Sequence, residues 1–447
     1  MGNAAVQAGK RATYPAYKPS GAPWLGDVPE HWEVRRLKYS ADLINQKVDG
    51  AEADLPYMGL EHIESWTGKR QGQNGDASSD GQANLFRRGD VLFGKLRPYL
   101  TKAYAADSEG ICTGELLVLR PKAVEQKFLL DYVLNPDFVT IVDSSTYGAK
   151  MPRANWDFIG NLPALIPPLV EQKAIAAFLD RETARTDALI ERKRRQIELL
   201  QEKRSALISH AATKGLDPHA PMKDSGIDWL GQIPKHWRIV PLKYSLLPRG
   251  GAIKTGPFGS QLLSSDMASG DVKVYNQRNV LDRDFLSGEN YVSDDKYEEL
   301  KSFTVFPQDV LITTRGTIGR CALLPDNAER GILHPCLMRV QPNPLITSPE
   351  YVALLIQDSG IVLLQLQLLS NATTIEVIYS ESLKSVRLPL PPASEQQAIL
   401  TYVTREAERH DALISKVQDS IDVLREHRTT LISAAVTGKI DVRGEVA

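Results

Sequence analysis

A long internal repeat constrains the fold of this chain more than any other feature of its sequence. Residues 20–32 (Ser-Gly-Ala-Pro-Trp-Leu-Gly-Asp-Val-Pro-Glu-His-Trp) return as residues 225–237 (Ser-Gly-Ile-Asp-Trp-Leu-Gly-Gln-Ile-Pro-Lys-His-Trp), and Leu-Lys-Tyr follows soon after each copy. Residues 167–175 (Pro-Pro-Leu-Val-Glu-Gln-Lys-Ala-Ile) return as residues 391–399 (Pro-Pro-Ala-Ser-Glu-Gln-Gln-Ala-Ile). The period greatly exceeds the roughly 20–50 residues of solenoid repeats. The repeat therefore predicts two domain-sized halves, each a globular body followed by a long helix, with two similar working surfaces.

The two parts of the repeat have different spacings. The offset in residue number is 205 between Trp32 and Trp237, whereas it is 224 between Glu171 and Glu395. The helical parts align without a gap, so the whole increase in offset, from 205 to 224, arises in the bodies. Between the shared boxes the bodies look unrelated, with Gly-Lys-Leu-Arg-Pro-Tyr at residues 94–99 and Thr-Arg-Gly-Thr-Ile-Gly-Arg at residues 314–320. A similar frame with dissimilar inserts suggests a scaffold that holds two readers of different targets.

Composition sets broad limits on the class of protein. With 447 residues, the chain has room for roughly two to four domains that each bury a core. No apolar run approaches the roughly 18 residues that span a bilayer, and no signal-peptide core is present. The scattered cysteines Cys112, Cys321 and Cys336 form no metal-ligand pair and fit a reducing compartment, so we expect a cytoplasmic protein. The net charge of -2 gives no support to nucleic-acid binding, although charge can be sorted by face or supplied by a partner.

The helical parts are the clearest structural prediction. Residues 169–212 and 394–437 contain neither proline nor glycine, and about 40 helical residues at 1.5 Å each make a rod of about 60 Å. A heptad pattern places apolar residues along one seam of each helix, with Arg204, Arg428 and Lys193 at the remaining seam positions. We expect the helices to pack on each other as an antiparallel coiled coil, with the bodies at opposite ends. The predicted packing residues are Ile190, Ile197, Leu200, Leu207, Ile414, Val417, Ile421, Leu424 and Leu431.

Short β-like runs punctuated by glycine and proline predict that each body is α/β (α+β). Examples are residues 91–93, 115–119 and 309–314, and helical stretches are expected near residues 125–134 and 349–369. The predicted fold is therefore two α/β bodies joined by an antiparallel helical pair, with pseudo-twofold symmetry. The predicted boundaries are 1–13 for a disordered N-terminus, 14–168 for the first body, 169–214 for the first helical region, 215–391 for the second body, 392–441 for the second helical region and 442–447 for a tail.

The repeated motifs together resemble the specificity subunit of type I restriction-modification systems. The resemblance rests on the two Trp-Leu-Gly-x-(Val/Ile)-Pro-x-His-Trp boxes, the two Pro-Pro…Glu-Gln…Ile helix starts, the Asp-Ala-Leu-Ile stretches at residues 187–190 and 411–414, and residues 89–98. Each motif alone is weak, but two copies of each in the same order make a specific signal. The resemblance covers nearly the whole chain apart from the first dozen residues.

The resemblance implies a DNA-binding protein of prokaryotic host defence. Its two bodies would be target recognition domains that each read one half of a bipartite, asymmetric DNA site. The coiled coil would set their spacing and dock two DNA methyltransferase (modification) subunits. In systems that also restrict DNA, motor-endonuclease subunits would join this complex. Adenine-N6 methylation and ATP-dependent cleavage would belong to those partners. This chain would therefore contain no catalytic residue, metal or cofactor, while S-adenosylmethionine and ATP with Mg would bind in the partner subunits.

Candidate DNA contacts come from loops that mix cations with amides, glycine or tyrosine. Reading a base edge needs forked donors for guanine or amides for adenine, and cations bind the phosphates. For each single residue, a solvated surface cation or a structural salt bridge is the alternative. The candidates are Lys69, Arg70, Gln71, Lys95, Arg97, Tyr99, Lys150 and Arg153 in the first body, and Lys254, Asn276, Gln277, Arg278, Arg315 and Arg320 in the second.

Two other functions stay open on the sequence alone: a coiled-coil scaffold without DNA reading, and a self-contained DNA-modifying enzyme. The second is disfavoured because the chain has no glycine-rich cofactor loop and no Pro-Asp…Asp/Glu-x-Lys nuclease pattern. Residues 135–138 (Asn-Pro-Asp-Phe) approximate the Asn-Pro-Pro-Phe box of adenine methyltransferases, but Asp137 replaces the second proline, which favours a plain turn after a helix. His31 and His236 favour packing or capping roles over metal binding.

Overall fold

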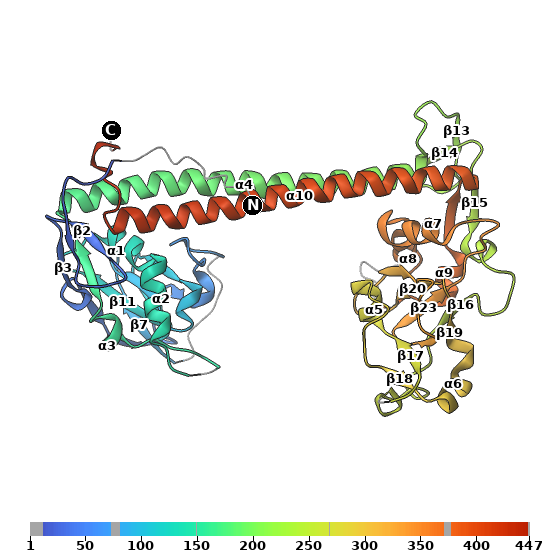
Figure 1. Cartoon of the computed structure of the whole chain (residues 1–447), viewed down its shortest axis with the longest axis horizontal. Coiled ribbons are helices and arrows are strands. Elements are labelled where there is room, and N and C mark those ends of the chain that lie inside the picture. Colours follow the sequence, from blue (N-terminus) through green and yellow to red (C-terminus); the bar gives the residue numbers. More distant parts are fainter. Residues whose placement is uncertain (1–11, 73–80, 149, 268, 371–376, 446–447) are drawn as a thin grey trace. The chain divides into compact units, whose positions relative to one another are not determined.

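The computed structural model describes residues 12–72, 81–148, 150–267, 269–370 and 377–445. Of the N-terminus 1–13 that was predicted to be disordered, residues 1–11 lie outside the described residues, and the Ala12 carbonyl accepts a hydrogen bond from the Asp441 amide at 2.7 Å. The chain forms two compact units, residues 1–194 with 418–447 and residues 195–417. The division passes through the middle of both long helices, α4 (Leu169–Lys214) and α10 (Ala393–Val436), so each unit holds one body and a segment of each helix (Figure 1).

The body of the first unit contains two small sheets with helices packed against them. One sheet is antiparallel, in the order β4 (Ala41–Ile44), β11 (Leu116–Pro121), β8 (Val91–Gly94) and β9 (Ala103–Ala105). The other is mixed, in the order β5 (Lys47–Asp49), β7 (Gln82–Phe86), β10 (Gly110–Cys112) and β6 (Tyr57–Met58), with β10 parallel to β6. The remaining elements are β1 (Tyr17–Pro19), β2 (Asp27–Pro29), β3 (Glu33–Arg36), η1 (Leu37–Tyr39), η2 (Leu60–His62), η3 (Pro98–Leu100), α1 (Gln126–Val133), α2 (Pro136–Ser144), α3 (Trp156–Ile159), β12 (Pro163–Ile166) and η8 (Arg443–Glu445).

The body of the second unit repeats the antiparallel sheet strand for strand. Its order is β16 (Ile253–Thr255), β23 (Leu337–Val340), β20 (Val310–Thr313) and β21 (Cys321–Leu323). Its mixed sheet has the order β18 (Tyr291–Val292), β17 (Val272–Tyr275), β22 (Gly331–Leu333) and β19 (Thr304–Val305). The remaining elements are β13 (Met222–Asp224), β14 (Gln232–Pro234), β15 (Arg238–Pro241), η4 (Leu242–Ser245), η5 (Ser264–Met267), α5 (Gln277–Asp282), α6 (Asp294–Leu300), η6 (Lys301–Phe303), α7 (Pro349–Ala353), η7 (Leu354–Asp358), α8 (Ile361–Ser370), α9 (Ser380–Ser385) and β24 (Arg387–Leu390).

The two bodies therefore share a core topology, although their sequences look unrelated. The strands β7, β10 and β6 of the first mixed sheet correspond to β19, β22 and β17 of the second, with the same parallel and antiparallel pairings. The fourth strand is added at opposite edges: β5 extends the sheet beside β7, whereas β18 extends it beside β17. The bodies thus differ in their edges and loops rather than in their frame.

The place where the second body gains length follows from the same strand matching. The offset between the halves is 205 at Trp32 and Trp237 and reaches 217 at Met58 and Tyr275, where β6 and β17 end. It is 224 where β12 and β24 end, which is also the offset of the helices. Most of the increase, from 205 to 217, therefore arises ahead of the end of β17, in the part of the second body that contains η5.

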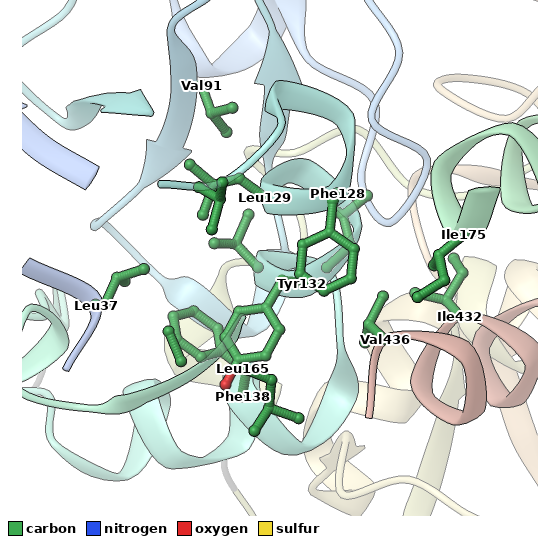
Figure 2. Packing of buried hydrophobic residues seen from close by; sticks show 14 of the residues in the cluster. Leu37, Val91, Phe128, Leu129, Tyr132, Phe138, Leu165, Ile175, Ile432 and Val436 are labelled. Carbon is green, nitrogen blue, oxygen red and sulfur yellow. The ribbon is translucent and has the colours of Figure 1, made fainter. Parts of the chain in front are cut away.

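Each body buries its core against the helix segments of its own unit. In the first unit, Phe128 and Tyr132 of α1 lie between the sheet and the helices, close to Ile175 of α4 and Val436 of α10 (Figure 2). In the second unit the corresponding cluster includes Trp237, Tyr351 of α7, Ile208 of α4 and Ile399 of α10. Because these clusters contain residues of both body and helices, each body is packed firmly against the helix segments of its own unit.

The helix segments run antiparallel within each unit. In the first unit Asp187 of α4 pairs with Arg428 of α10, and Ile175, which precedes Asp187, packs near Ile432, which follows Arg428. In the second unit Arg204 pairs with Asp411, at an Nε–Oδ1 distance of 3.0 Å. The two ion pairs are related by the offset of the helices, since Asp187 corresponds to Asp411 and Arg204 to Arg428.

The nine predicted coiled-coil residues are all buried or partly buried. Ile190, Val417, Ile421 and Leu431 are buried, and Ile197, Leu200, Leu207, Ile414 and Leu424 are partly buried. Both helices end near a glycine with positive φ, Gly215 at +77° and Gly438 at +72°, a conformation that glycine adopts without the steric cost of a Cβ atom.

Two local predictions need correction. Residues 349–369 do not form one helix: α7 continues directly into the π-helical segment η7, and Gly360 with a φ of +71° then separates η7 from α8. Residues 135–138 do not form a plain turn, since Asn135 accepts a hydrogen bond from the Asp137 amide at 3.0 Å and caps α2, and Pro136 occupies the first helical position. Within the described residues, no single helix is long and apolar enough to span a bilayer, and the bent pair Pro349–Asp358 and Ile361–Leu369 meets that criterion only when both pieces are taken together.

Asp131 of α1 gives the first unit a pH-dependent stability. Burial, and then the nearby Asp180 carboxylate, raises the pKa of Asp131 to about 8, against the opposing effect of Arg428 and Lys127. An unfolded aspartate titrates near 3.9, so the folded state holds a proton that the unfolded state releases, and stability falls as pH rises from about 4 to about 8.

We therefore expect Asp131→Asn, which mimics the neutral acid at every pH, to raise the melting temperature more at pH 8 than at pH 5. Thermal unfolding followed by circular dichroism at both pH values measures the difference. Glu52→Gln, at an exposed position of the same body, is the matched control and should show no such pH trend. A gain that is larger at pH 5 would contradict the assignment of a raised pKa to Asp131.

Candidate nucleic-acid interface

A repeated hydrogen-bonded interlock seats each body on its helix. Glu171, in the first turn of α4, accepts a hydrogen bond from Trp32 Nε1 at 2.8 Å and lies 2.7 Å from His31 Nε2. Glu395, in the first turn of α10, accepts from Trp237 Nε1 at 3.0 Å and lies 2.7 Å from His236 Nε2. The histidines are thus bonded to structural carboxylates. Among the described residues, no group of three or more His, Cys, Asp or Glu side chains could hold a metal ion.

The neighbouring glutamines complete the interlock. Gln172 accepts a hydrogen bond from the Glu125 amide at 2.6 Å and donates one to the Pro167 carbonyl at 2.8 Å. Gln396 accepts from the Ser348 amide at 3.1 Å and donates to the Pro391 carbonyl at 3.0 Å. Each glutamine therefore ties the start of its long helix to the start of the body helix α1 or α7.

The first unit has additional contacts at its interlock. Arg443 lies 3.4 Å from the Glu171 carboxylate, and its guanidinium lies 4.9 Å from the centre of the Tyr14 ring. Burial, together with the Glu171 carboxylate, raises the pKa of the Tyr14 hydroxyl. Among the described residues, Glu171 consequently accepts hydrogen bonds from, or pairs with, more groups than Glu395 does.

The predicted residues Lys95, Arg97 and Tyr99 lie in the loop that follows β8, and Lys150 lies in a neighbouring loop. The Arg97 amide donates to the Pro152 carbonyl at 2.8 Å, and Arg97 Nη2 donates to the Lys150 carbonyl at 3.4 Å. Arg97, Tyr99 and Lys150 are exposed, and Lys95 is partly exposed. The two loops therefore present cations and an aromatic ring together at one end of the antiparallel sheet.

A polar groove of about 510 Å³ adjoins these loops. Lys95 and Tyr147 line it from the loops, and β5 and β7 contribute amides and a further cation, so that its chemistry suits base edges and phosphates. Polar groove residues that the sequence did not single out include Asn45, Lys47, Gln82, Asn84 and Asn155, together with Glu115, which pairs with Arg153. Lys47 and Asn84 are direct cross-strand partners on β5 and β7, so the register of these strands would have been needed to find them from the sequence.

Other predicted residues of the first body already have partners within the chain. Arg153 makes a forked pair with Glu115 at 2.8–3.0 Å, and Lys69 Nζ lies 2.6 Å from the Asp187 carboxylate of α4. Gln71 Nε2 donates to the Glu61 carbonyl at 2.8 Å. Burial raises the pKa of the Tyr104 phenol to about 12, and the nearby Arg70 charge opposes part of this rise. Lys69, Arg70 and Gln71 lie on a loop of their own, which adjoins the end of the loop after β8 because the Trp66 amide donates to the Thr101 carbonyl at 2.9 Å. The contact of these three residues with DNA stays a prediction.

In the second body Arg315 and Arg320 lie in the loop that follows β20, and both are exposed. Gln277, in the first turn of α5, lies against this loop, since a Cβ atom on Gly316 would be 3.6 Å from Gln277 Nε2. Gln277 therefore adjoins the loop that carries Arg315 and Arg320, and the contact of these three residues with DNA stays a prediction.

The other three predicted residues of the second body have local partners. Asn276 caps α5 by accepting from the Arg278 amide at 2.9 Å, and the Arg278 side chain pairs with Asp282 at 3.1 Å. The Lys254 ammonium lies 4.8 Å from the centre of the Phe303 ring. For these residues as well, a contact with DNA stays a prediction.

The two cationic loops occupy equivalent places in the shared frame. The loop of the first body leaves β8 at Gly94, which pairs with Leu116 of β11, and the loop of the second body leaves β20 at Thr313, which pairs with Leu337 of β23. The turns that enter the two strands also match, because Asp90 accepts from the Arg87 amide and Asp309 from the Phe306 amide, both at 2.8 Å. An Asp-Val-Leu triplet that begins at Asp90 and again at Asp309 was the available sequence signal for this equivalence.

Comparison with known proteins gives consistent results. The family model described as type I restriction modification DNA specificity domain matches residues 29–199 and 263–421. The chain is 24% identical over 442 residues to the putative type I restriction enzyme MjaX specificity subunit of Methanocaldococcus jannaschii, covering 94% of this chain and 96% of that protein. It is 27% identical over 171 residues to the type I restriction enzyme EcoDI specificity subunit of Escherichia coli, covering 37% of this chain and 38% of that subunit. A chain solved in work on complex assembly and conformational transition of the type I R-M system shares the fold, with a TM-score of 0.64 at 20% identity over 92% of this chain and 98% of that one.

Proposed function

This chain belongs to the family of type I restriction modification DNA specificity domains, and from that premise we propose that each of its bodies reads one half of a bipartite, asymmetric DNA sequence. The chain is accordingly the DNA specificity subunit of a type I restriction-modification system. The observation that carries the two-reader proposal is the pair of cationic loops after β8 and β20. They leave the same place in the same frame, yet they carry different residues, as two readers of different half-sites require.

The proposed division of labour leaves the chemistry to partner subunits. The specificity family is non-catalytic in itself, and the assembled complex would methylate adenine at N6 and, in a restricting system, cleave DNA with ATP. S-adenosylmethionine, and ATP with Mg, would bind in those subunits. The Asn135 side chain supports this reading, since it is buried and caps α2 rather than opening onto a cofactor site.

The helices are the proposed docking site for two modification subunits. Support comes from apolar residues that remain exposed on the helices of both units at equivalent positions. Leu189 and Val423 are exposed in the first unit, and Leu413 and Leu199 are exposed in the second. The offset of the helices relates Leu189 to Leu413 and Leu199 to Val423, so two copies of one partner would meet matching surfaces.

The test of the two-reader proposal is a body exchange. Replacing residues 40–160 with the corresponding segment of another specificity subunit should change one half of the methylated sequence and leave the other half unchanged. Mapping N6-methyladenine in the host genome measures both halves at once. The matched exchange of the second body should change the complementary half. If one exchange altered both half-sites, the bodies would not be independent readers and the proposal would fail.

A further inference from the structure

Almost every residue that the two Trp-Leu-Gly boxes share has a structural role. The shared leucines, prolines and second tryptophans are buried, the shared histidines bond to Glu171 and Glu395, and the shared glycines need a positive φ. The shared serines close a turn, with Ser20 Oγ accepting from the Ala22 amide and Ser225 Oγ from the Ile227 amide, each at 3.1 Å. Packing and backbone geometry therefore account for these identities.

The Lys-Tyr pair after each box is the exception. The side chains of Tyr39 and Tyr244 are exposed, at 58% and 63%. Each lysine ammonium lies over the ring of the next residue, Lys38 at 5.5 Å and Lys243 at 4.8 Å from the ring centre. Within the part of the chain that the structure describes, no hydrogen bond or ion pair of these four side chains is found. Tyr39, Lys243 and Tyr244 are exposed and Lys38 is partly exposed, so packing within the fold does not explain why two diverged halves keep the same pair.

Each Lys-Tyr pair also has an arginine beside it, although the arginine comes from a different strand in each unit. In the first unit Arg36 of β3 pairs in register with Pro163 of β12. In the second unit Pro241 of β15 pairs in register with Arg387 of β24. Both arginines are exposed, although Arg36 Nη1 also donates to the Asn161 side chain at 3.2 Å. Each half thus keeps one arginine at this register position, supplied by opposite strands.

We name these surfaces patch 1 (Arg36, Lys38 and Tyr39) and patch 2 (Arg387, Lys243 and Tyr244). Each patch lies at one end of a strand, β11 in the first unit and β23 in the second, and the cationic loop lies at the other end of that strand. In the first unit the loop begins next to Leu116, whereas Tyr39 lies two residues before Ala41, the partner of Pro121. In the second unit the loop begins next to Leu337, whereas Tyr244 lies two residues before Leu246, the partner of Pro342. About five residues of strand separate the two ends in each body, which is about 16 Å.

We propose that patch 1 and patch 2 are equivalent docking surfaces, each for one copy of the same modification subunit. The partner surface would offer carboxylates to the lysine and arginine and an apolar side chain to the tyrosine ring. Tyrosine and arginine are enriched at interface centres, and charged pairs such as that of the lysine belong to the polar rim. Two different DNA half-sites would not require the same surface twice, but two copies of one protein do. The inference rests on the proposed function, because that function supplies a partner present in two copies, and it adds a contact on the bodies to the one on the helices.

The test uses the full chain with its cognate modification subunit. Lys38→Glu with Tyr39→Ala should weaken binding of one copy at least 100-fold and give a one-to-one complex in native mass spectrometry. Adding Lys243→Glu with Tyr244→Ala should weaken binding of both copies. Tyr39→Phe with Tyr244→Phe keeps the rings and should retain both copies. Lys95→Ala with Arg97→Ala, at the opposite sheet end, should also retain both copies.

The outcomes separate this proposal from the proposed function. If the fourfold variant, shown to be folded by its unchanged melting temperature, still binds two copies with unchanged affinity, the docking surfaces are elsewhere. If it assembles normally but binds DNA with a shallower salt dependence, the patches are phosphate contacts and the proposal is overturned. If the unaltered chain binds no modification subunit at all, the proposed function itself fails, and the patch proposal fails with it.

Discussion

Replacing Lys95 and Arg97 together by alanine is expected to lower the affinity of the assembled complex for its DNA site about 100-fold. Both residues lie in the loop after β8, where Arg97 is exposed and its backbone is held by the Pro152 carbonyl. A good base contact contributes about 1–3 kcal/mol, and every 1.4 kcal/mol is about a tenfold change, so the loss of two contacts gives this magnitude. Fluorescence anisotropy with a duplex that carries the mapped site, at one fixed salt concentration, measures it.

The matched variant in the second body is Arg315→Ala with Arg320→Ala. Each double variant should relax the methylated sequence in its own half-site only. Arg153→Ala is the control within the first body, because Arg153 is held in a forked pair with Glu115 and its loss should change stability more than sequence preference. Equal relaxation of both half-sites by Lys95→Ala with Arg97→Ala would contradict the placement of a reader in this loop.

Glu171→Ala is expected to lower the free energy of unfolding of the first unit by about 3 kcal/mol. The substitution leaves Trp32 Nε1, in a fully buried side chain, without its acceptor, and it removes a carboxylate that Arg443 approaches at 3.4 Å. A buried donor left unsatisfied costs about 1–3 kcal/mol, and the contact with Arg443, whose side chain reaches solvent, adds up to about 1 kcal/mol. Urea unfolding followed by tryptophan fluorescence measures the change.

Glu395→Ala is the matched control for this prediction. Glu395 accepts from Trp237 and approaches His236, but its carboxylate lacks a counterpart of the Arg443 contact among the described residues, so the loss should be smaller. Glu171→Gln keeps an acceptor for Trp32 and should lose less than Glu171→Ala. An unchanged unfolding curve for Glu171→Ala would show that the interlock does not stabilise the first unit.

The helices were predictable from sequence, and the architecture of the bodies was only partly so. The predicted stretches 169–212 and 394–437 agree closely with α4 and α10, because helical order is local and is readable from the absence of glycine and proline. The heptad pattern also places arginine on the seam, at positions 204 and 428. Arg428 donates to the carbonyls of Trp66 and Thr67 as well as to Asp187, contacts that no local pattern contains.

Strand pairing depends on partners far away in the sequence, and so the shared topology of the bodies was missed. The strands β8 and β20 share only a short Asp-Val-Leu start, and their equivalence becomes clear through their burial and their pairing with β11 and β23. The partners of the candidate DNA-contact residues could not be predicted for the same reason. Composition brought Lys69 and Arg153 forward, but their partners Asp187 and Glu115 lie 118 and 38 residues away, and only the fold brings them together.

The interlock at Glu171 and Glu395 has a consequence for how such proteins diversify. The histidine and tryptophan partners of both glutamates belong to the shared boxes, so these contacts depend on the frame of a body and not on the loops that the body carries. A body inherited or acquired at one seat would therefore fit the other seat as well. Recombination among a small pool of bodies would generate a number of two-part recognition sequences that grows as the square of the pool, while the partner subunits stay unaltered.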